Sequence, residues 1–146
     1  MEKIKKRRSS ISKTLSANDT GETGGHQAGI LVPKQEDILS FFPPLQRSEL
    51  NPRHHLIFYD DKDERWEFAF IYYNNRFFGG TRNEFRLTRM TPYINESGLR
   101  AGDELILERS ESGRYLIKYR RAKSTGKDRD GVLRLGSSWR VVEIQF

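Results

Sequence analysis

LIFYDDKDERWEFAFIYYN, residues 56–74, is the most informative part of this chain for its fold class. It holds two runs rich in aromatic and β-branched residues, separated by the polar break DDKDE. Such runs favour β-strands and acidic residues are common turn formers, so the segment predicts a β-hairpin. An antiparallel sheet is therefore expected at the centre of the chain.

Further short strands are expected on both sides of this hairpin. The predicted strands lie at 30–32, 56–60, 65–74, the segment before Met90, 102–110, 114–121 and 139–146. The predicted helices lie at 33–42, where Pro33 begins the helix and a Pro-Pro pair stops it, and at 91–99. This spacing indicates a mainly β fold of about seven strands in an open β-barrel or a sandwich, with two short helices.

Composition limits the classes of protein to which the chain can belong. Its 146 residues suit one domain, and 26 Lys and Arg against 20 Asp and Glu give a formal net charge of +6. This charge favours a polyanionic partner or a solvated cationic face. The absence of cysteine excludes disulfides and thiolate metal sites, and it fits an intracellular location. No segment approaches the ~20 apolar residues of a membrane helix, so no membrane partner is expected.

The N-terminal segment is strongly basic. From Met1 to Thr14 it carries six Lys or Arg residues against one Glu, and it lacks apolar periodicity. We therefore expect residues 1–12 to form a basic flexible arm that contacts phosphates, and residues 13–146 to form the folded domain. The alternative is a solvated terminus without a binding role.

The sequence offers no catalytic site. Phosphodiester hydrolysis commonly needs clustered carboxylates that bind a metal, and the available acidic cluster sits in one hairpin turn, where such residues are usually solvated. That cluster consists of Asp60, Asp61, Asp63 and Glu64. The histidines lack metal-site spacing, and the glycine-rich segment matches neither common nucleotide-binding motif. No metal or other cofactor is expected for this domain.

Two polar loops have complementary character. SANDTGETGGHQAG at 16–29 offers hydroxyl, amide, imidazole and backbone donors. NNRFFGGTRNEFRLTR at 74–89 carries four arginines, Arg89 among them, with Asn83 and a single Glu84. Arginine can bind phosphate or guanine O6 and N7, and a carboxylate can accept from cytosine N4. Glu84 either neutralises neighbouring arginines or reads a donor on a base, and the sequence leaves both open.

Both loops belong to segments that resemble one family. KTLSANDTGETGGHQAGILVP at 13–33 and YYNNRFFGGTRNEFRLTRM at 72–90 are similar to segments of the N-terminal effector domains of EcoRII-type restriction endonucleases. ELNP at 49–52 lies between them in the same order. Beyond Met90, SGLRAGDELILER is similar to the distal half of the wider DNA-binding pseudobarrel superfamily, which includes plant transcription-factor domains.

The resemblance implies a seven-stranded DNA-binding pseudobarrel whose two arms clasp the major groove of double-stranded DNA. By position, the first arm runs from Lys13 through His26 and the second from Arg76 to about Arg86. The implied DNA-binding residues are Lys13, Ser16, Asn18, Thr20, Thr23, His26, Gln27, Arg76, Thr81, Arg82, Asn83, Glu84 and Arg86.

Their implied roles differ. The main base readers would be Arg82, Glu84 and Arg86, with Asn83 supporting them and His26 assisting from the first arm. Base edges or phosphates would be contacted by Arg76 and Lys13. In the family the positions equivalent to Gly80 and Phe85 are basic, so any contact made there is lost or replaced in this chain.

The resemblance also implies a role in restriction. In such enzymes this domain binds an extra copy of the recognition site and regulates or anchors a nuclease domain. The nuclease domain would be covalently linked downstream, and only there would Mg²⁺ be needed. The implied target is CCWGG, where W is A or T, bound by one asymmetric monomer in the cytoplasm of a prokaryote.

Two further functions stay open at this point. A stand-alone regulator or single-strand binder could use exposed aromatic rings as stacking platforms, namely Phe77, Phe78, Tyr72 and Tyr73. A nuclease in its own right could use the acidic turn and the chain's arginines.

Overall fold

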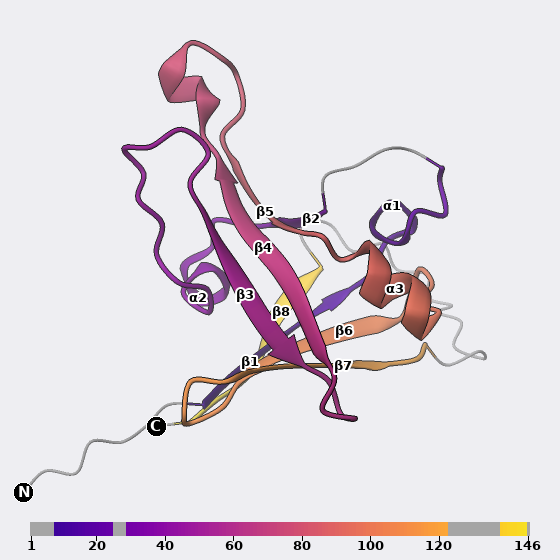
Figure 1. Cartoon of the computed structure of the whole chain (residues 1–146). Coiled ribbons are helices and arrows are strands. Elements are labelled where there is room, and N and C mark those ends of the chain that lie inside the picture. The colour runs from indigo at the N-terminus through magenta and orange to yellow at the C-terminus, as the bar shows by residue number, and fades with distance from the viewer. Residues whose placement is uncertain (1–7, 25–28, 123–137, 146) are drawn as a thin grey trace, which may run out of the picture.

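The computed structural model describes residues 8–24, 29–122 and 138–145. Eight strands form one sheet in the order β2-β5-β4-β3-β7-β6-β1-β8, and this sheet curls into an open barrel (Figure 1). The mainly β open barrel expected from the sequence is confirmed, with eight strands in place of about seven.

The elements are short. The strands are β1 (Arg8–Thr14), β2 (Ile30–Val32), β3 (Arg53–Tyr59), β4 (Arg65–Tyr73), β5 (Glu84–Thr88), β6 (Glu104–Arg109), β7 (Tyr115–Arg120) and β8 (Trp139–Gln145). The helices are α1 (Ala17–Thr20), α2 (Glu36–Leu39), α3 (Thr91–Ser97) and the 3₁₀ turn η1 (Asn75–Phe78). Within the described ranges, no helix is long and apolar enough to span a membrane.

The hairpin expected at 56–74 is present as β3 and β4, which pair antiparallel. Its turn is organised by Asp60, whose Oδ1 accepts hydrogen bonds from the amides of Lys62 (2.8 Å) and Glu64 (2.9 Å). The other carboxylate oxygen accepts from Nε1 of Trp66 at 3.0 Å. Asp60 is therefore a structural turn residue, because both of its oxygens are occupied by the hairpin itself.

The prediction of a flexible arm at residues 1–12 is wrong for residues 8–12. β1 lies between β6 and β8, so its backbone is paired on both sides. Ile11 joins the hydrophobic core, and Ser10 and Ser12 are buried beside it. RSSISKT shows no hydrophobic alternation because it contains one apolar residue, yet small serines fit between two neighbouring strands. Residues 1–7 lie outside the described residues.

The helix expected at 33–42 is a single turn, α2, preceded by Gln35 in an extended conformation. After it, the amides of Phe41 and Phe42 donate to carbonyls three residues earlier, at 3.1 Å each. The residue before a proline is disfavoured in helical conformation, so Pro43 favours this tightened end. Two helical turns that the sequence does not predict, α1 and η1, lie within the two polar loops.

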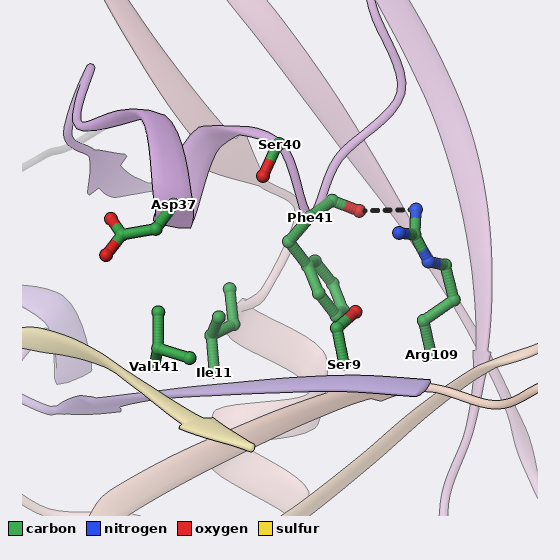
Figure 2. A pocket seen from close by; sticks show the side chains of 7 residues that line it. All are labelled: Ser9, Ile11, Asp37, Ser40, Phe41, Arg109 and Val141. Carbon is green, nitrogen blue, oxygen red and sulfur yellow. Dashed lines mark hydrogen bonds between the residues drawn. The ribbon is translucent and has the colours of Figure 1, made fainter. Parts of the chain in front are cut away.

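One small hollow, of about 80 Å³, lies where α2 covers β1 and β8. Figure 2 shows Phe41 reaching from the end of α2 towards β1, beside Ile11. On the rim of the hollow, Nη1 of Arg109 donates to the carbonyl of Phe41 at 3.0 Å. These contacts fix α2 on the barrel.

The barrel is open between its edge strands, β2 and β8. A side chain links them, because Nε1 of Trp139 in β8 donates to the carbonyl of Leu31 in β2 at 2.9 Å. β2 in turn pairs with β5, the strand that carries Glu84 and Arg86. The hydrogen bond from Trp139 therefore ties β8 to the pair of strands that carries Glu84 and Arg86.

Candidate nucleic-acid interface

Two segments project from the barrel (Figure 1). We call the connection between β1 and β2 the first arm, and residues 74–83 between β4 and β5 the second arm. The first arm carries α1, and the second carries η1 at the top of the view, with β2 and β5 between them. The structure thus contains two projecting loops, at the positions where the sequence predicts the two recognition arms.

The first arm starts with a capped helical turn instead of the expected open loop. The side chain of Ser16 accepts a hydrogen bond from the amide of Asp19 at 3.1 Å, and the carboxylate of Asp19 accepts from the amide of Ser16 at 2.9 Å. This reciprocal capping box satisfies helix N-terminal donors. Thr23 donates to the side chain of Asn18 at 3.2 Å, which adds a second internal tie.

Lys13, a predicted DNA contact, is largely buried in this structure. Only 7% of this residue is exposed, and its Nζ forms an ion pair with Oδ2 of Asp19 at 2.6 Å. Lys13 therefore supports α1 from within the domain. His26 and Gln27, two more predicted contacts of this arm, lie outside the described residues.

A carboxylate fastens the first arm to the loop before β6. Oε2 of Glu22 accepts hydrogen bonds from the hydroxyl of Thr20 and from the amide of Ala101, both at 2.7 Å, and lies 3.7 Å from Nε of Arg100. The Thr20 bond, followed by the Ala101 bond, holds the pKa of Glu22 below its ordinary value. Glu22 is consequently a charged tether between two loops.

The second arm is fastened by a buried amide. Asn74 is 0% exposed, and its Nδ2 donates to the carbonyls of Glu49 (2.8 Å) and Arg47 (3.3 Å). The amide of Asn51 donates to Oδ1 of Asn74 at 2.8 Å, and the amide of Asn74 donates to Oδ1 of Asn51 at 3.2 Å. Asn51 has φ 50°, a conformation that asparagine tolerates better than most residues. The ELNP segment thus anchors the second arm.

The tip of the second arm is closed by its own backbone. The amide of Arg82 donates to Oδ1 of Asn75, and the amide of Gly80 donates to the carbonyl of Asn75, both at 2.7 Å. The amide of Arg76 donates to the carbonyl of Arg82 at 2.9 Å. A Cβ atom at Gly80 would lie 2.6 Å from Cγ of Asn75, so this closure favours glycine where the family pattern has a basic residue.

The three predicted base readers meet at the base of the second arm. Oε2 of Glu84 accepts from Nη2 of Arg82 at 2.6 Å and from Nε of Arg86 at 2.8 Å. The guanidinium of Arg82 also lies 3.9 Å from the centroid of the Tyr73 ring. The hydrogen bond from Arg82 lowers the pKa of Glu84 more than partial burial raises it, and the hydrogen bond from Arg86 lowers it further. The pKa of Glu84 therefore lies below its ordinary value. In this structure Glu84 neutralises the arginines, one of its two predicted possibilities.

Arg86 also ties β5 to the end of the first arm. Nη1 of Arg86 donates to the carbonyl of Gly29 at 2.9 Å, where the first arm returns to the barrel. Gly29 has φ 88°, and a Cβ there would lie 2.3 Å from the carbonyl oxygen of Leu87. This close approach of two backbones requires glycine.

Alternation along β5 separates two faces. Phe85 and Leu87 are buried, whereas Glu84 and Arg86 are half-buried on the other face. Phe85 stacks on Tyr72 with centroids 4.2 Å apart, so the second departure from the family pattern lies on the face turned away from Glu84. Tyr72 donates from its hydroxyl to Oδ1 of Asn83, which holds that predicted supporting residue.

A cleft of about 210 Å³ lies between the first arm, the ends of β4 and β5, and α3. It is lined by Asp19 and Gly29 of the first arm, by Tyr73 at the end of β4 and by Arg89 after β5. Arg89 is exposed, has φ 67°, and makes no ion pair with any residue in the described part of the chain. Its place in the arginine-rich segment was the available signal, but the family pattern does not include it among the contacts.

The structure therefore brings together only part of the predicted site. Four predicted residues cluster at the base of the second arm: Arg82, Asn83, Glu84 and Arg86. Two others, Arg76 and Thr81, are exposed further along this arm. Ser16, Asn18, Thr20 and Thr23 are used in contacts within the first arm. Among the described residues, no group of three His, Cys, Asp or Glu side chains could hold a metal ion.

Comparison with known proteins identifies the family. The family model described as "Restriction endonuclease EcoRII, N-terminal" matches residues 6–103. The chain belongs to this family. The resemblance seen in the sequence is thereby confirmed, and the match includes both arms of this EcoRII N-terminal domain.

Individual relatives extend the comparison. The chain is 48% identical over 82 residues to the type II restriction enzyme EcoRII of Escherichia coli, an alignment that covers 53% of the chain and 20% of that enzyme. It is 33% identical over 122 residues to auxin response factor 10 of Arabidopsis thaliana, covering 84% of the chain and 16% of that protein. The chain thus spans about a fifth or less of these relatives.

A solved structure supports the fold. The protein in the structure described as the Arabidopsis FUS3-DNA complex superimposes with a TM-score of 0.58 and 19% sequence identity. The superposition covers 77% of this chain and 96% of that chain. The chain therefore shares its fold with that protein at low sequence identity.

Proposed function

We propose that this domain binds a short sequence in double-stranded DNA, with its two arms in the major groove. The observation that carries the proposal is the hydrogen-bonded cluster of Arg82, Glu84 and Arg86, which lies where the anchored second arm runs into β5. Family membership and the likeness to a protein solved with DNA support the same conclusion.

The chemistry of this cluster suits guanine and cytosine. Arginine donates in bidentate fashion to O6 and N7 of guanine, and a carboxylate accepts from N4 of cytosine. Oε1 of Glu84 makes no hydrogen bond to any described residue, so this oxygen can accept from a base while Oε2 keeps an arginine in place. A target rich in G·C pairs, such as CCWGG, fits this donor and acceptor set.

Contacts to the DNA backbone would come from cations beside the cluster. Arg76 is exposed on the second arm, and Arg89 is exposed in the cleft. Phosphate contacts fix the register of a protein on the duplex without reading its sequence. We assign these two arginines that role, and the first arm would contact the opposite side of the groove.

Duplex binding is favoured over a single-strand platform by the aromatic side chains. Tyr72 is buried against Phe85, and the ring of Tyr73 is covered by the guanidinium of Arg82. Of the four rings that could stack on unpaired bases, only Phe77 and Phe78 are exposed. Two rings on a narrow tip make a poor platform for successive bases.

We further propose that the domain serves as the effector part of a type II restriction endonuclease. The E. coli relative is a restriction enzyme of which the aligned segment is 20%, so a nuclease domain in the same polypeptide is the expected partner. Mg²⁺ would be required by that nuclease, and the domain described here would supply the bound recognition site.

Competition binding tests the proposed function. The protein is titrated at near-physiological salt onto a labelled CCWGG duplex, against the same duplex with the five central pairs scrambled. We expect a preference of about 10³-fold or more. Glu84→Ala should abolish most of this preference, while Glu111→Ala, in the exposed turn between β6 and β7, should keep it. Equal affinity of the unaltered protein for both duplexes would contradict sequence-specific binding to CCWGG.

A further inference from the structure

Two phenylalanines stand at the tip of the second arm. Phe77 is 64% exposed and Phe78 is 49% exposed, next to the cationic side chain of Arg76. Leaving large apolar side chains in water forgoes the stabilisation that burial would give. A pair of them on a projecting turn is typical of a surface that another molecule covers.

The tip cannot easily turn these rings inward. The amide of Phe77 donates to the carbonyl of Asn74 at 3.0 Å, and Asn74 is itself fixed in the buried amide cluster. Gly79 ends η1 with φ 96°, and Asn75 closes the turn onto Arg82. The guanidinium of Arg76 lies 6.0 Å from the Phe77 centroid and leaves the outer part of the pair exposed. The rings are therefore held outward.

The charge around the rings identifies the class of partner. Residues 74–83 contain two arginines and no acidic residue, and the nearest carboxylate in the chain, on Glu84, is bonded to arginines. A surface that combines apolar rings with positive charge fits an anionic partner that also has apolar parts. Duplex DNA is such a partner, because thymine methyl groups in the major groove and deoxyribose in the backbone give it apolar parts beside its phosphates.

We propose that Phe77 and Phe78 make an apolar contact with duplex DNA outside the base pairs read by Glu84 and Arg86. This inference rests on the proposed function. The Tyr73–Glu84 pair is the last rung between β4 and β5, and the two phenylalanines lie at the far end of the turn beyond it. The contact lengthens the DNA site without adding to the set of bases read by hydrogen bonds.

The test combines two duplexes with three proteins. Both duplexes carry the same recognition sequence, and one extends about one helical turn, roughly 10 bp, further on each side. The proteins are the unaltered chain, the double variant Phe77→Ala/Phe78→Ala, and the control Val142→Ala, in which a residue of β8 that is 44% exposed is shortened. All three should keep the same thermal unfolding midpoint because the altered side chains are exposed.

The proposal predicts a loss on the long duplex alone. The double variant should bind the short duplex like the unaltered protein and the long duplex about tenfold more weakly, as expected when part of two aromatic surfaces stays in water. The slope of log affinity against log salt should not change, because no phosphate contact is removed. Val142→Ala should match the unaltered protein on both duplexes.

Three results would overturn the proposal. Unchanged binding of the long duplex would show that the rings do not touch DNA, and equal losses on both duplexes would place the contact inside the recognised sequence. In a further titration, onto one strand of the long duplex, a larger loss than on the duplexes would indicate stacking on unpaired bases. If the unaltered protein showed no sequence preference, the proposed function would fail, and the effect of duplex length could still be measured on random sequence.

Discussion

The two arms are fastened to the barrel in different ways. The first arm is held by charged groups: the largely buried Lys13–Asp19 ion pair and the Glu22 carboxylate at Ala101. The second arm is held by neutral amides, because Asn74 is fully buried and bonded to the 47–51 loop. Acid and salt should therefore loosen the first arm, whereas only a change in the core should loosen the second.

The largest effect is expected at the anchor of the second arm. Asn74→Ala should lower the free energy of unfolding by about 2–4 kcal/mol, since it leaves buried backbone groups without partners. Urea denaturation measures this change, and Asn95→Ala on the exposed face of α3 is the control. A loss no greater than that of the control would mean that the amide cluster does not anchor the arm.

The stability of the loop at 98–103, to which Glu22 ties the first arm, should depend on pH. Burial raises the pKa of Asp103, but hydrogen bonds from the amides of Ala122 and Arg100 and the charge of Arg121 outweigh it, so the pKa lies below its ordinary 3.8. A carboxyl with a lowered pKa stabilises the fold fully above its ordinary value and loses this contribution as pH falls through the lowered one.

We expect unfolding experiments in acid to separate the two anchors. Between about pH 5 and pH 2, the stability of the unaltered protein should fall more steeply than that of Asp103→Asn, because the variant lacks this titration. Amide exchange in the loop at 98–103 should accelerate before exchange around Asn74. Simultaneous loss of protection in both regions would break the distinction between a charged and a neutral anchor.

The tether of the first arm should affect affinity more than stability. Glu22→Ala removes the acceptor for Thr20 and Ala101, so the arm should be less well positioned before binding. We expect weaker binding to the specific duplex and little change on a scrambled one. Titration of both duplexes measures it, and Glu22→Gln, which keeps an acceptor oxygen, should recover part of the loss. Equal losses on both duplexes would make Glu22 a contributor to general charge only.

The smallest effect, on the salt dependence of DNA binding, is expected for a substitution of Lys13. Lys13→Met keeps the buried stem and removes the ion pair, so the slope of log affinity against log salt should stay the same. A slope reduced by about 0.9 would instead reveal a phosphate contact, as the family resemblance implies. In that case the first arm would have to rearrange on binding and release Lys13 from Asp19.

Much of the fold could be predicted because its strands show ordinary signals. The β3–β4 hairpin combines aromatic runs with an acidic turn, and Asp60 organises that turn as such residues commonly do. β1 could not be predicted in this way, because a strand paired on both sides needs little more than Ile11 to join the core.

The candidate site also contains some residues whose role the sequence predicts and others whose role it does not. Glu84 stands out in the sequence as the one acid among arginines, and the structure places it between Arg82 and Arg86. The anchoring role of Asn74 gives no local signal, since its partners lie more than twenty residues away in the chain. The position of Arg89 in the cleft could not be predicted for another reason, because it depends on how the first arm returns to the barrel.

The central claim is that Glu84 and its arginines read particular base pairs. The most direct measurement is the affinity of the unaltered protein and of Glu84→Ala for a set of duplexes in which each pair of CCWGG is replaced in turn. The unaltered protein should lose about 1–3 kcal/mol for each G·C pair replaced. Glu84→Ala should lose its discrimination at the pair that this carboxylate reads and keep it at the others. A variant that binds every duplex more weakly by the same factor would contradict the claim.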